Sequence, residues 1–84
     1  MFAVEWLPSA EQDLARLWNQ GPDRDEIAAA ADAVDRALMR DPLGLGESRG
    51  GATRIVFEVP LAILFDVEVS GGKVKVWDIW RWPP

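Results

Sequence analysis

The sequence predicts a single α+β domain over residues 1–84, in which an antiparallel sheet carries a helical hairpin packed on one face. The main evidence is a change of period: apolar residues recur at helical spacing in the first half and alternate with polar residues from position 53 onward. A glycine-rich stretch separates the two halves. The length suits one domain, and the expected element order is β-α-α-β-β-β.

The chain begins with a short strand and a first helix. Residues 2–6 alternate apolar and polar side chains, which is typical of a half-buried strand. A helix is expected over residues 9–19, because Ser9 and Gln12 have the spacing of a capping box. The Gly-Pro pair at 21–22 ends it.

A second helix is expected from about residue 23 to Arg40, with Asp23 or Asp25 as its N-cap. Asp32 and Arg36 have the i,i+4 spacing of an ion pair on its outer side. One stripe of the helix is apolar and predicts its buried face: Ile27, Ala31, Val34 and Leu38. A short turn between the helices predicts an antiparallel hairpin.

Residues 43–52 contain four glycines and are interpreted as a flexible loop. Three strands follow, separated by Pro60 and by a hairpin signal at residues 70–72. The last strand changes phase at Trp77, which predicts either a bulge or a strand covered on both faces.

Composition excludes several kinds of site. The chain has no Cys and no His, so disulfides are excluded and a zinc site of the usual kind is not expected. Asp23, Asp25 and Glu26 superficially resemble a metal cluster, but a helix start favours acids on its own account. We expect no metal and no cofactor. No apolar run is long enough for a bilayer, and residues 1–11 do not resemble a signal peptide, so the expected location is the cytoplasm.

The formal net charge is −5, and it lies in the first half of the chain. Residues 1–42 hold nine acids and four arginines, whereas residues 43–84 hold five acids and five bases. This balance opposes strong binding of nucleic acid at long range. A small core without cross-links instead favours a protein partner.

The order of the elements and several short motifs resemble the RelE/ParE superfamily of toxins from bacterial type II toxin–antitoxin pairs. The motifs are Val4-Glu5-Trp6-x-Pro8-x-Ala10, Leu38-x-x-Asp41-Pro42, Gly46 and Arg49 before Arg54-Ile55, Ile63-Leu64-Phe65-Asp66-Val67, and Val74-x-Val76-Trp77-x-Ile79-x-Arg81. The resemblance covers nearly the whole chain, although no single motif is specific. It implies a curved antiparallel sheet with the helical hairpin packed on one face, and a partner antitoxin whose extended or helical segment wraps around the toxin.

The resemblance also implies a choice of activities. RelE-like members cleave mRNA on the ribosome with Lys, Arg and a Tyr or His, whereas ParE-like members lack that set and poison DNA gyrase. This chain departs from the ribonuclease pattern: Leu61-Ala62 stands where Tyr-Arg is common, Arg81-Trp82 where His-Arg or Lys-Arg is common, and there is no Tyr.

The candidate catalytic residues are the cations Arg54 and Arg81, with Asp78 or Asp66 as a possible base. Arg49 is a further candidate cation. The alternative for Arg54 and Arg81 is a solvated strand residue or the partner of an acid on the same face.

The five tryptophans divide into two groups. Trp6 and Trp18 are expected in the core, whereas at least one tryptophan of the run 77–82 is expected to be exposed or covered by a partner. Because Trp and Arg are enriched at binding hot spots, the candidate partner-binding residues are Arg49, Trp80 and Trp82.

Together these features predict a toxin-like component of a type II pair that binds a cognate antitoxin and has a reduced ribonuclease site. Two alternatives remain: a non-toxic protein-binding module of the same fold, and an atypical ribosome-dependent mRNA endoribonuclease that uses Arg54 and Arg81. A second copy of the chain is another candidate partner. The ribosome with its mRNA, or gyrase, would be a target only of an active toxin.

Overall fold

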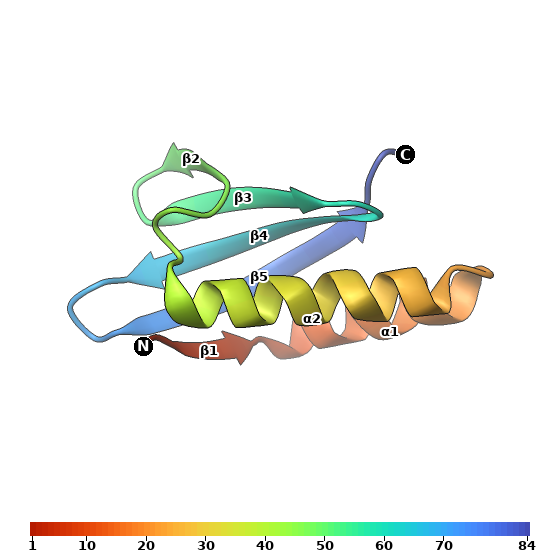
Figure 1. Cartoon of the computed structure of the whole chain (residues 1–84), viewed down its shortest axis with the longest axis horizontal. Helices are drawn as coiled ribbons and strands as arrows, with labels where there is room; N and C mark the ends of the chain where they lie inside the picture. The colour runs from red at the N-terminus through yellow and green to blue at the C-terminus, as the bar shows by residue number, and fades with distance from the viewer.

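The computed structural model describes residues 1–84 and confirms the α+β class (Figure 1). Five strands form one sheet in the order β1-β5-β4-β3-β2. The elements are β1 (Ala3–Trp6), α1 (Pro8–Gln20), α2 (Arg24–Arg40), β2 (Glu47–Gly50), β3 (Thr53–Glu58), β4 (Leu61–Glu68) and β5 (Lys73–Arg81).

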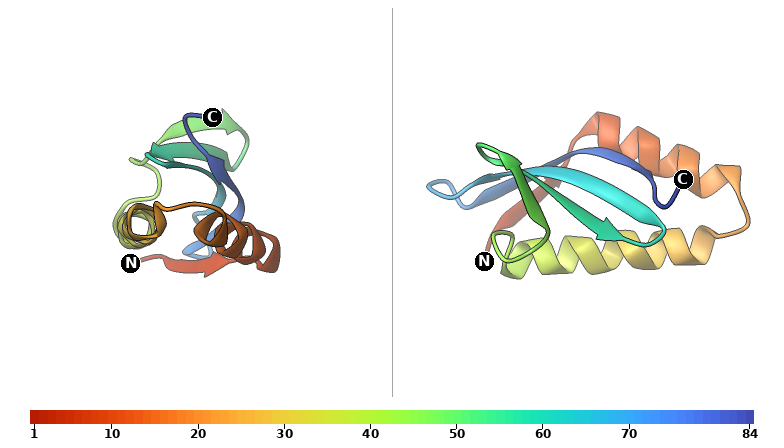
Figure 2. Two further views of the ribbon diagram at one scale, coloured as in Figure 1. Left: turned by 90° about the vertical axis from the view of Figure 1, so that its right-hand side faces the viewer. Right: turned by 90° about the horizontal axis from the view of Figure 1, so that it is seen from above.

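Both helices lie on the same side of a curved sheet, as two views at right angles show (Figure 2). Helix α1 packs mainly on β5, and α2 packs on β1, β3 and β4. The opposite face of the sheet carries no helix and is called the uncovered face. The expected helical hairpin on one face is confirmed.

The core lies between the helices and the sheet. Strand β4 supplies Leu61, Ile63, Phe65 and Val67, which alternate along the strand toward the helices. The predicted stripe of α2, from Ile27 to Leu38, is buried against them. No charged or polar side chain is buried in this core.

The glycine-rich stretch is not entirely a loop, and in this respect the prediction was wrong. Residues 47–50 form the edge strand β2, which pairs antiparallel with β3. Gly50 and Gly51 have φ of 106° and 55°, so they supply the left-handed backbone that this tight connection needs. The alternation that marks a strand is absent here because all four residues of β2 are exposed.

The sheet is mainly antiparallel, as expected, but its first strand is an exception. Strand β1 pairs parallel with β5, with Val4 opposite Val74 and Trp6 opposite Val76. No turn joins these two strands, so the sequence held no local signal for the direction of their pairing.

The predicted helix caps were wrong in detail. Helix α1 begins at Pro8, which is favoured in the first helical turn, so the N-cap is Leu7 rather than Ser9. The Ser9 hydroxyl donates instead to the carbonyl of Trp77 at 3.1 Å. Asp23 is the N-cap of α2, but its side chain makes no capping bond. The predicted pair Asp32–Arg36 is confirmed at 2.7 Å.

The phase change in β5 is a bulge. Leu64 lies opposite Asp78 and the next residue of β4, Phe65, lies opposite Val76, so Trp77 is the extra residue. Ile79 therefore returns to the core while Trp77 turns to the uncovered face.

The expectation for the first two tryptophans is only half right. Trp6 packs against the core, but Trp18 is 41% exposed, and the Arg24 guanidinium lies 4.5 Å from its ring centroid. An apolar residue at helical spacing can lie at the edge of the buried stripe, and Trp18 does so near the end of α1. Neither helix has the length and apolar character needed to cross a membrane.

Candidate functional site

An aromatic row crosses the uncovered face at one end of the sheet. Phe57 on β3 lies opposite Ala62 on β4, and Ala62 lies opposite Trp80 on β5. Trp82 follows on the same side as Trp80, and its ring centroid is 5.0 Å from that of Phe57, with the rings tilted by 47°. These four residues, Phe57, Ala62, Trp80 and Trp82, are called the aromatic row below.

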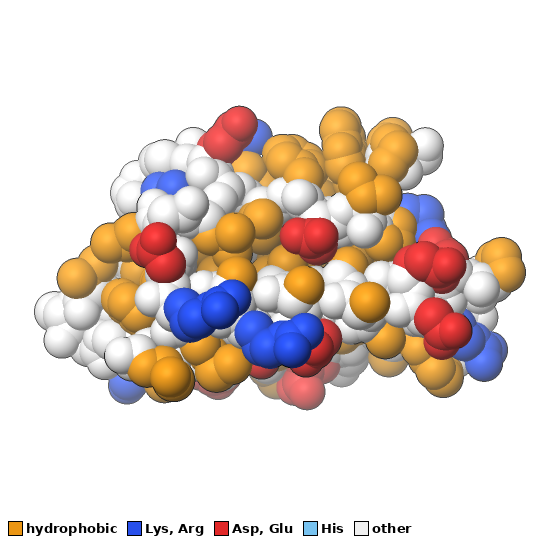
Figure 3. Space-filling model, in the orientation of Figure 1, with side chains coloured by type: hydrophobic (Ala, Val, Ile, Leu, Met, Phe, Trp, Pro, Cys, Tyr) orange, Lys and Arg blue, Asp and Glu red, His pale blue; other side chains and the backbone are white.

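Ala62 in the aromatic row is buried, whereas its three aromatic residues are at least partly exposed. Ala62 is fully buried although it faces away from the helices, because its cross-strand neighbours are large. Phe57 is 41% and Trp82 40% exposed, and Trp80 is half-buried. In the space-filling view hydrophobic side chains gather above the end where the β3–β4 turn and the C-terminus lie (Figure 3). Exposed aromatic surface of this kind is typical of a binding site for another protein.

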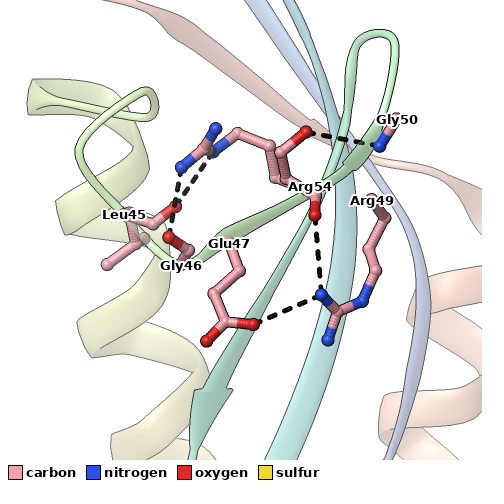
Figure 4. A network of polar contacts seen from close by, with 7 residues as sticks. Leu45, Gly46, Glu47, Arg49, Gly50 and Arg54 are labelled. Carbon is pink, nitrogen blue, oxygen red and sulfur yellow. Dashed lines mark hydrogen bonds and ion pairs between the residues drawn. The ribbon is translucent and has the colours of Figure 1, made fainter.

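Arg54 holds the loop that leads into β2 (Figure 4). Its guanidinium donates to the carbonyl of Leu45 at 3.2 Å and to that of Gly46 at 3.1 Å. It lies on the same side of β3 as the core residue Val56, so it does not point to the uncovered face. These N–H groups of Arg54 are therefore engaged in hydrogen bonds within the domain.

Arg81 is also engaged within the domain. It shares the helix side of β5 with Ile79 and forms an ion pair with Asp23 at the start of α2. The Arg81 side chain is 35% and the Asp23 side chain 27% exposed. The other carboxylate oxygen of Asp23 is buried without a hydrogen-bond partner. Arg81 thus has an acid as its partner, but this acid lies at the start of α2 and not on the sheet face, as the alternative had it.

Arg49, on the exposed edge strand β2, pairs with Glu47 at 3.2 Å. Its side chain is 44% exposed, so the pair is weak and the guanidinium stays accessible.

The structure does not bring the two candidate catalytic cations together. Arg54 lies opposite Phe65 of β4 and Arg81 lies opposite Leu61, four residues away along that strand. At about 3.3 Å per residue this is about 13 Å, and the two arginines also lie on different strands.

The candidate bases lie on the other face from these arginines. Asp66 accepts from the Thr53 hydroxyl at 2.7 Å and from the Trp77 indole at 3.2 Å. Asp78 accepts from the backbone of Ile79. The uncovered face thus presents carboxylates and aromatic rings, while Arg54 and Arg81 point away from it. No group of three or more acidic side chains converges as a metal site would require.

We expect the pair Arg81–Asp23 to stabilise the domain by about 1 kcal/mol of coupling energy, since it is only partly exposed. A double-mutant cycle with Arg81→Met and Asp23→Asn, followed by denaturant melts, measures it. The control is a cycle on Arg36–Asp32, whose side chains are 65% and 62% exposed and whose expected coupling is about 0.3 kcal/mol. Equal coupling in the two cycles would contradict the prediction.

Phe57 was not among the site residues predicted from the sequence. The signal was present: Phe57 alternates with the core residue Val56, so it had to face away from the helices. The strand register that places Phe57 beside Trp82 could not be predicted from the sequence.

Known structures share this fold over nearly the whole chain. A chain of the toxin–antitoxin complex RelBE2 from Mycobacterium tuberculosis matches 95% of this chain and 96% of its own, with a TM-score of 0.76 and 20% identity. A chain of the chromosomal ParDE TA system from P. aeruginosa matches 96% of each chain, with a TM-score of 0.70 and 19% identity. No family model and no curated protein matches the sequence. At these identities the likeness establishes the fold.

Proposed function

We propose that this chain, which has the RelE/ParE fold, is the toxin-like component of a bacterial type II toxin–antitoxin pair and binds a cognate antitoxin. The observation that carries the proposal is the aromatic row on the sheet face that carries no helix. The two similar structures support it, because each belongs to a toxin–antitoxin system. The proposed location is the cytoplasm.

We also propose that this chain has only part of the residue set of a ribonuclease site. Where the resemblance implies a Tyr-Arg pair at the start of a strand, Leu61 and Ala62 are both fully buried. Arg54 donates to carbonyls of its own chain, and Arg81 is paired with Asp23. Phosphoryl transfer from RNA needs cations at the developing negative charge, and neither arginine lies on the face where the candidate bases lie.

The proposed antitoxin contact consists of Trp80, Trp82 and Arg49. The tryptophans supply apolar area at one end of the sheet, and Arg49 supplies a cation on the edge strand β2, which β3 and β4 separate from β5. The outer edge of β2 has no neighbouring strand, so it offers backbone groups with which an extended antitoxin segment would pair. Trp or Arg side chains would anchor that segment.

We expect the purified protein to cleave ribosome-bound mRNA far more slowly than a ribonuclease member with the full set of residues. The reason is the lack of His and Tyr together with Ala at position 62. Cleavage would be followed by primer extension on translating ribosomes, with the Arg54→Ala, Arg81→Ala double variant beside the wild type. Strong codon-dependent cleavage that the double variant loses would favour the atypical endoribonuclease instead.

Inducible expression with and without the adjacent gene tests the proposed function as a whole. Growth arrest that the neighbouring gene relieves, and a complex of the two products, is the expected result. A complex without growth arrest would identify a non-toxic binding module, and no complex would overturn the proposal. If growth stops, assays of gyrase supercoiling and of translation separate the two kinds of target.

A further inference from the structure

A second row of side chains lies beside the aromatic row on the uncovered face. The strand register runs across the sheet from Glu47 on β2 through Ile55 and Leu64 to Asp78 on β5. This row has a carboxylate at each end and apolar side chains between them, and it is called the acid-ended row. On β3, β4 and β5 it lies two residues, or about 7 Å, from the aromatic row.

Of the two carboxylates, that of Asp78 has no cation of its own. One of its oxygens accepts from the backbone N–H of Ile79 at 3.0 Å, and it takes part in no ion pair of the domain. Glu47, in contrast, is paired with Arg49 at 3.2 Å. Asp78 comes two residues before Trp80 on β5, so its negative charge lies beside the tryptophans of the aromatic row.

The two lysines of the chain lie at the other end of the uncovered face. Lys73 and Lys75 flank the buried Val74 at the start of β5. Lys75 lies opposite Asp66 on β4 and Glu5 on β1, so an acid flanks it on each side. The charge of Asp78 beside the exposed aromatic rings is therefore not balanced by these lysines.

The rings of the aromatic row are open to a cation. Phe57 and Trp82 are 41% and 40% exposed. The face of an aromatic ring attracts a guanidinium or ammonium group within about 6 Å. The chain makes this contact once within itself, between Arg24 and Trp18, and not on the aromatic row.

We propose that the aromatic row and Asp78 bind arginine side chains of a basic, extended segment of the antitoxin. Guanidinium groups lie against the exposed rings, and the Asp78 carboxylate accepts hydrogen bonds from one of them. Arginine suits this surface better than lysine, because its planar group both stacks on aromatic rings and donates to carboxylates. The net charge of −5 attracts such a segment at long range. The identity of the partner rests on the proposed function.

The same charges oppose a nucleic acid on this surface. Proteins that stack aromatic side chains on single-stranded bases also line the strand with cations for its phosphates. Here the charged residue beside the tryptophans is the carboxylate of Asp78.

The probes are two capped peptides of about nine residues that differ only at three alternate positions, which hold arginine or citrulline. Citrulline has the shape of arginine without its charge. Each peptide is titrated into the labelled full chain, and the indole N–H signals of Trp80, Trp82 and Trp18 are followed by NMR. The arginine peptide is expected to shift Trp80 and Trp82 saturably and to bind about tenfold more tightly than the citrulline peptide.

The site variants are Asp78→Asn and Trp82→Leu, and the matched control is Asp25→Asn. Asp25→Asn removes the same charge as Asp78→Asn, but from an exposed position in the first turn of α2, on the other side of the sheet. Each site variant should reduce the preference for arginine from about tenfold to about twofold, and the control should leave it unchanged. Equal affinity for the two peptides, equal effects of the two Asp→Asn variants, shifts at Trp18 alone, or tighter binding of a single-stranded RNA of about eight nucleotides would each overturn the proposal.

The same variants separate this inference from the proposed function. Asp78→Asn should also weaken the complex with the product of the adjacent gene about fivefold, since the segment that binds is basic. A complex that Asp78→Asn leaves unchanged, together with no preference for arginine, would overturn the arginine site and leave the proposed function standing. A preference for arginine without any such complex would uphold the site and overturn the proposed function.

Discussion

Phe65→Ala is expected to lower the free energy of unfolding by about 4 kcal/mol, the usual range for removing a buried phenylalanine being about 3–5 kcal/mol. Phe65 is fully buried on β4, the central strand of the sheet, and belongs to the core under the helices. A domain of this size has a total stability of roughly 5–10 kcal/mol. Denaturant melts monitored by circular dichroism measure the loss.

Phe57→Ala is the control for this prediction, since it removes the same side chain from the uncovered face. Phe57 is 41% exposed and its main aromatic contact is Trp82, so the expected loss is about 1 kcal/mol. If Phe57→Ala destabilised the domain as much as Phe65→Ala, the uncovered face would be a second core rather than a binding surface.

Trp82→Ala is expected to weaken the complex with the antitoxin by about 2 kcal/mol or more, the size of a hot-spot effect. The same change should lower the stability of the free domain by only about 1 kcal/mol, because Trp82 is 40% exposed and loses mainly its contact with Phe57. Binding calorimetry and denaturant melts measure the two quantities separately.

Trp77→Ala serves as the matched control for the binding measurement. Trp77 lies on the same face and is 36% exposed, but it belongs to the bulge and donates to Asp66 instead of joining the aromatic row. Its expected effect on affinity is small. Unchanged affinity of Trp82→Ala together with a large loss of stability would show that Trp82 acts as a core residue.

The sequence predicted those elements whose pattern is set by burial against the core. The stripe from Ile27 to Leu38 and the alternation along β4 both arise because one side of the element meets the core and the other does not. The phase change at Trp77 was visible for the same reason, since a shift of one residue moves the apolar positions to the other face. The sequence left a bulge and a strand covered on both faces as alternatives, and the strand register identifies the bulge.

Elements without such a pattern could not be predicted. All four residues of strand β2 are exposed. The strand forms because it pairs with β3 and because Arg54 donates hydrogen bonds to carbonyls of the preceding loop. Ser9 matched a capping box, but Pro8 moved the helix start by one residue and the hydroxyl bonds to Trp77 instead.

The candidate site, too, could be predicted from the sequence only in part. Residue types identified Arg54 and Arg81 as candidate cations, but their contacts decide what they do, and these contacts are set by tertiary structure. Asp23 and Arg81 are 58 positions apart, and no local pattern connects them. The exposure of Trp82, in contrast, follows from alternation along β5 once the bulge is placed.

The pairing of β1 with β5 has a consequence for how the chain folds during synthesis. Residues 3–6 bond to residues 73–76, which leave the ribosome about 70 residues later. The amide of Leu7 likewise donates to the carbonyl of Val76. Until β5 emerges, β1 has no neighbouring strand and α1 lacks the strand against which it packs. Contacts between such distant segments slow folding, so the nascent domain stays incomplete until its last strand is made.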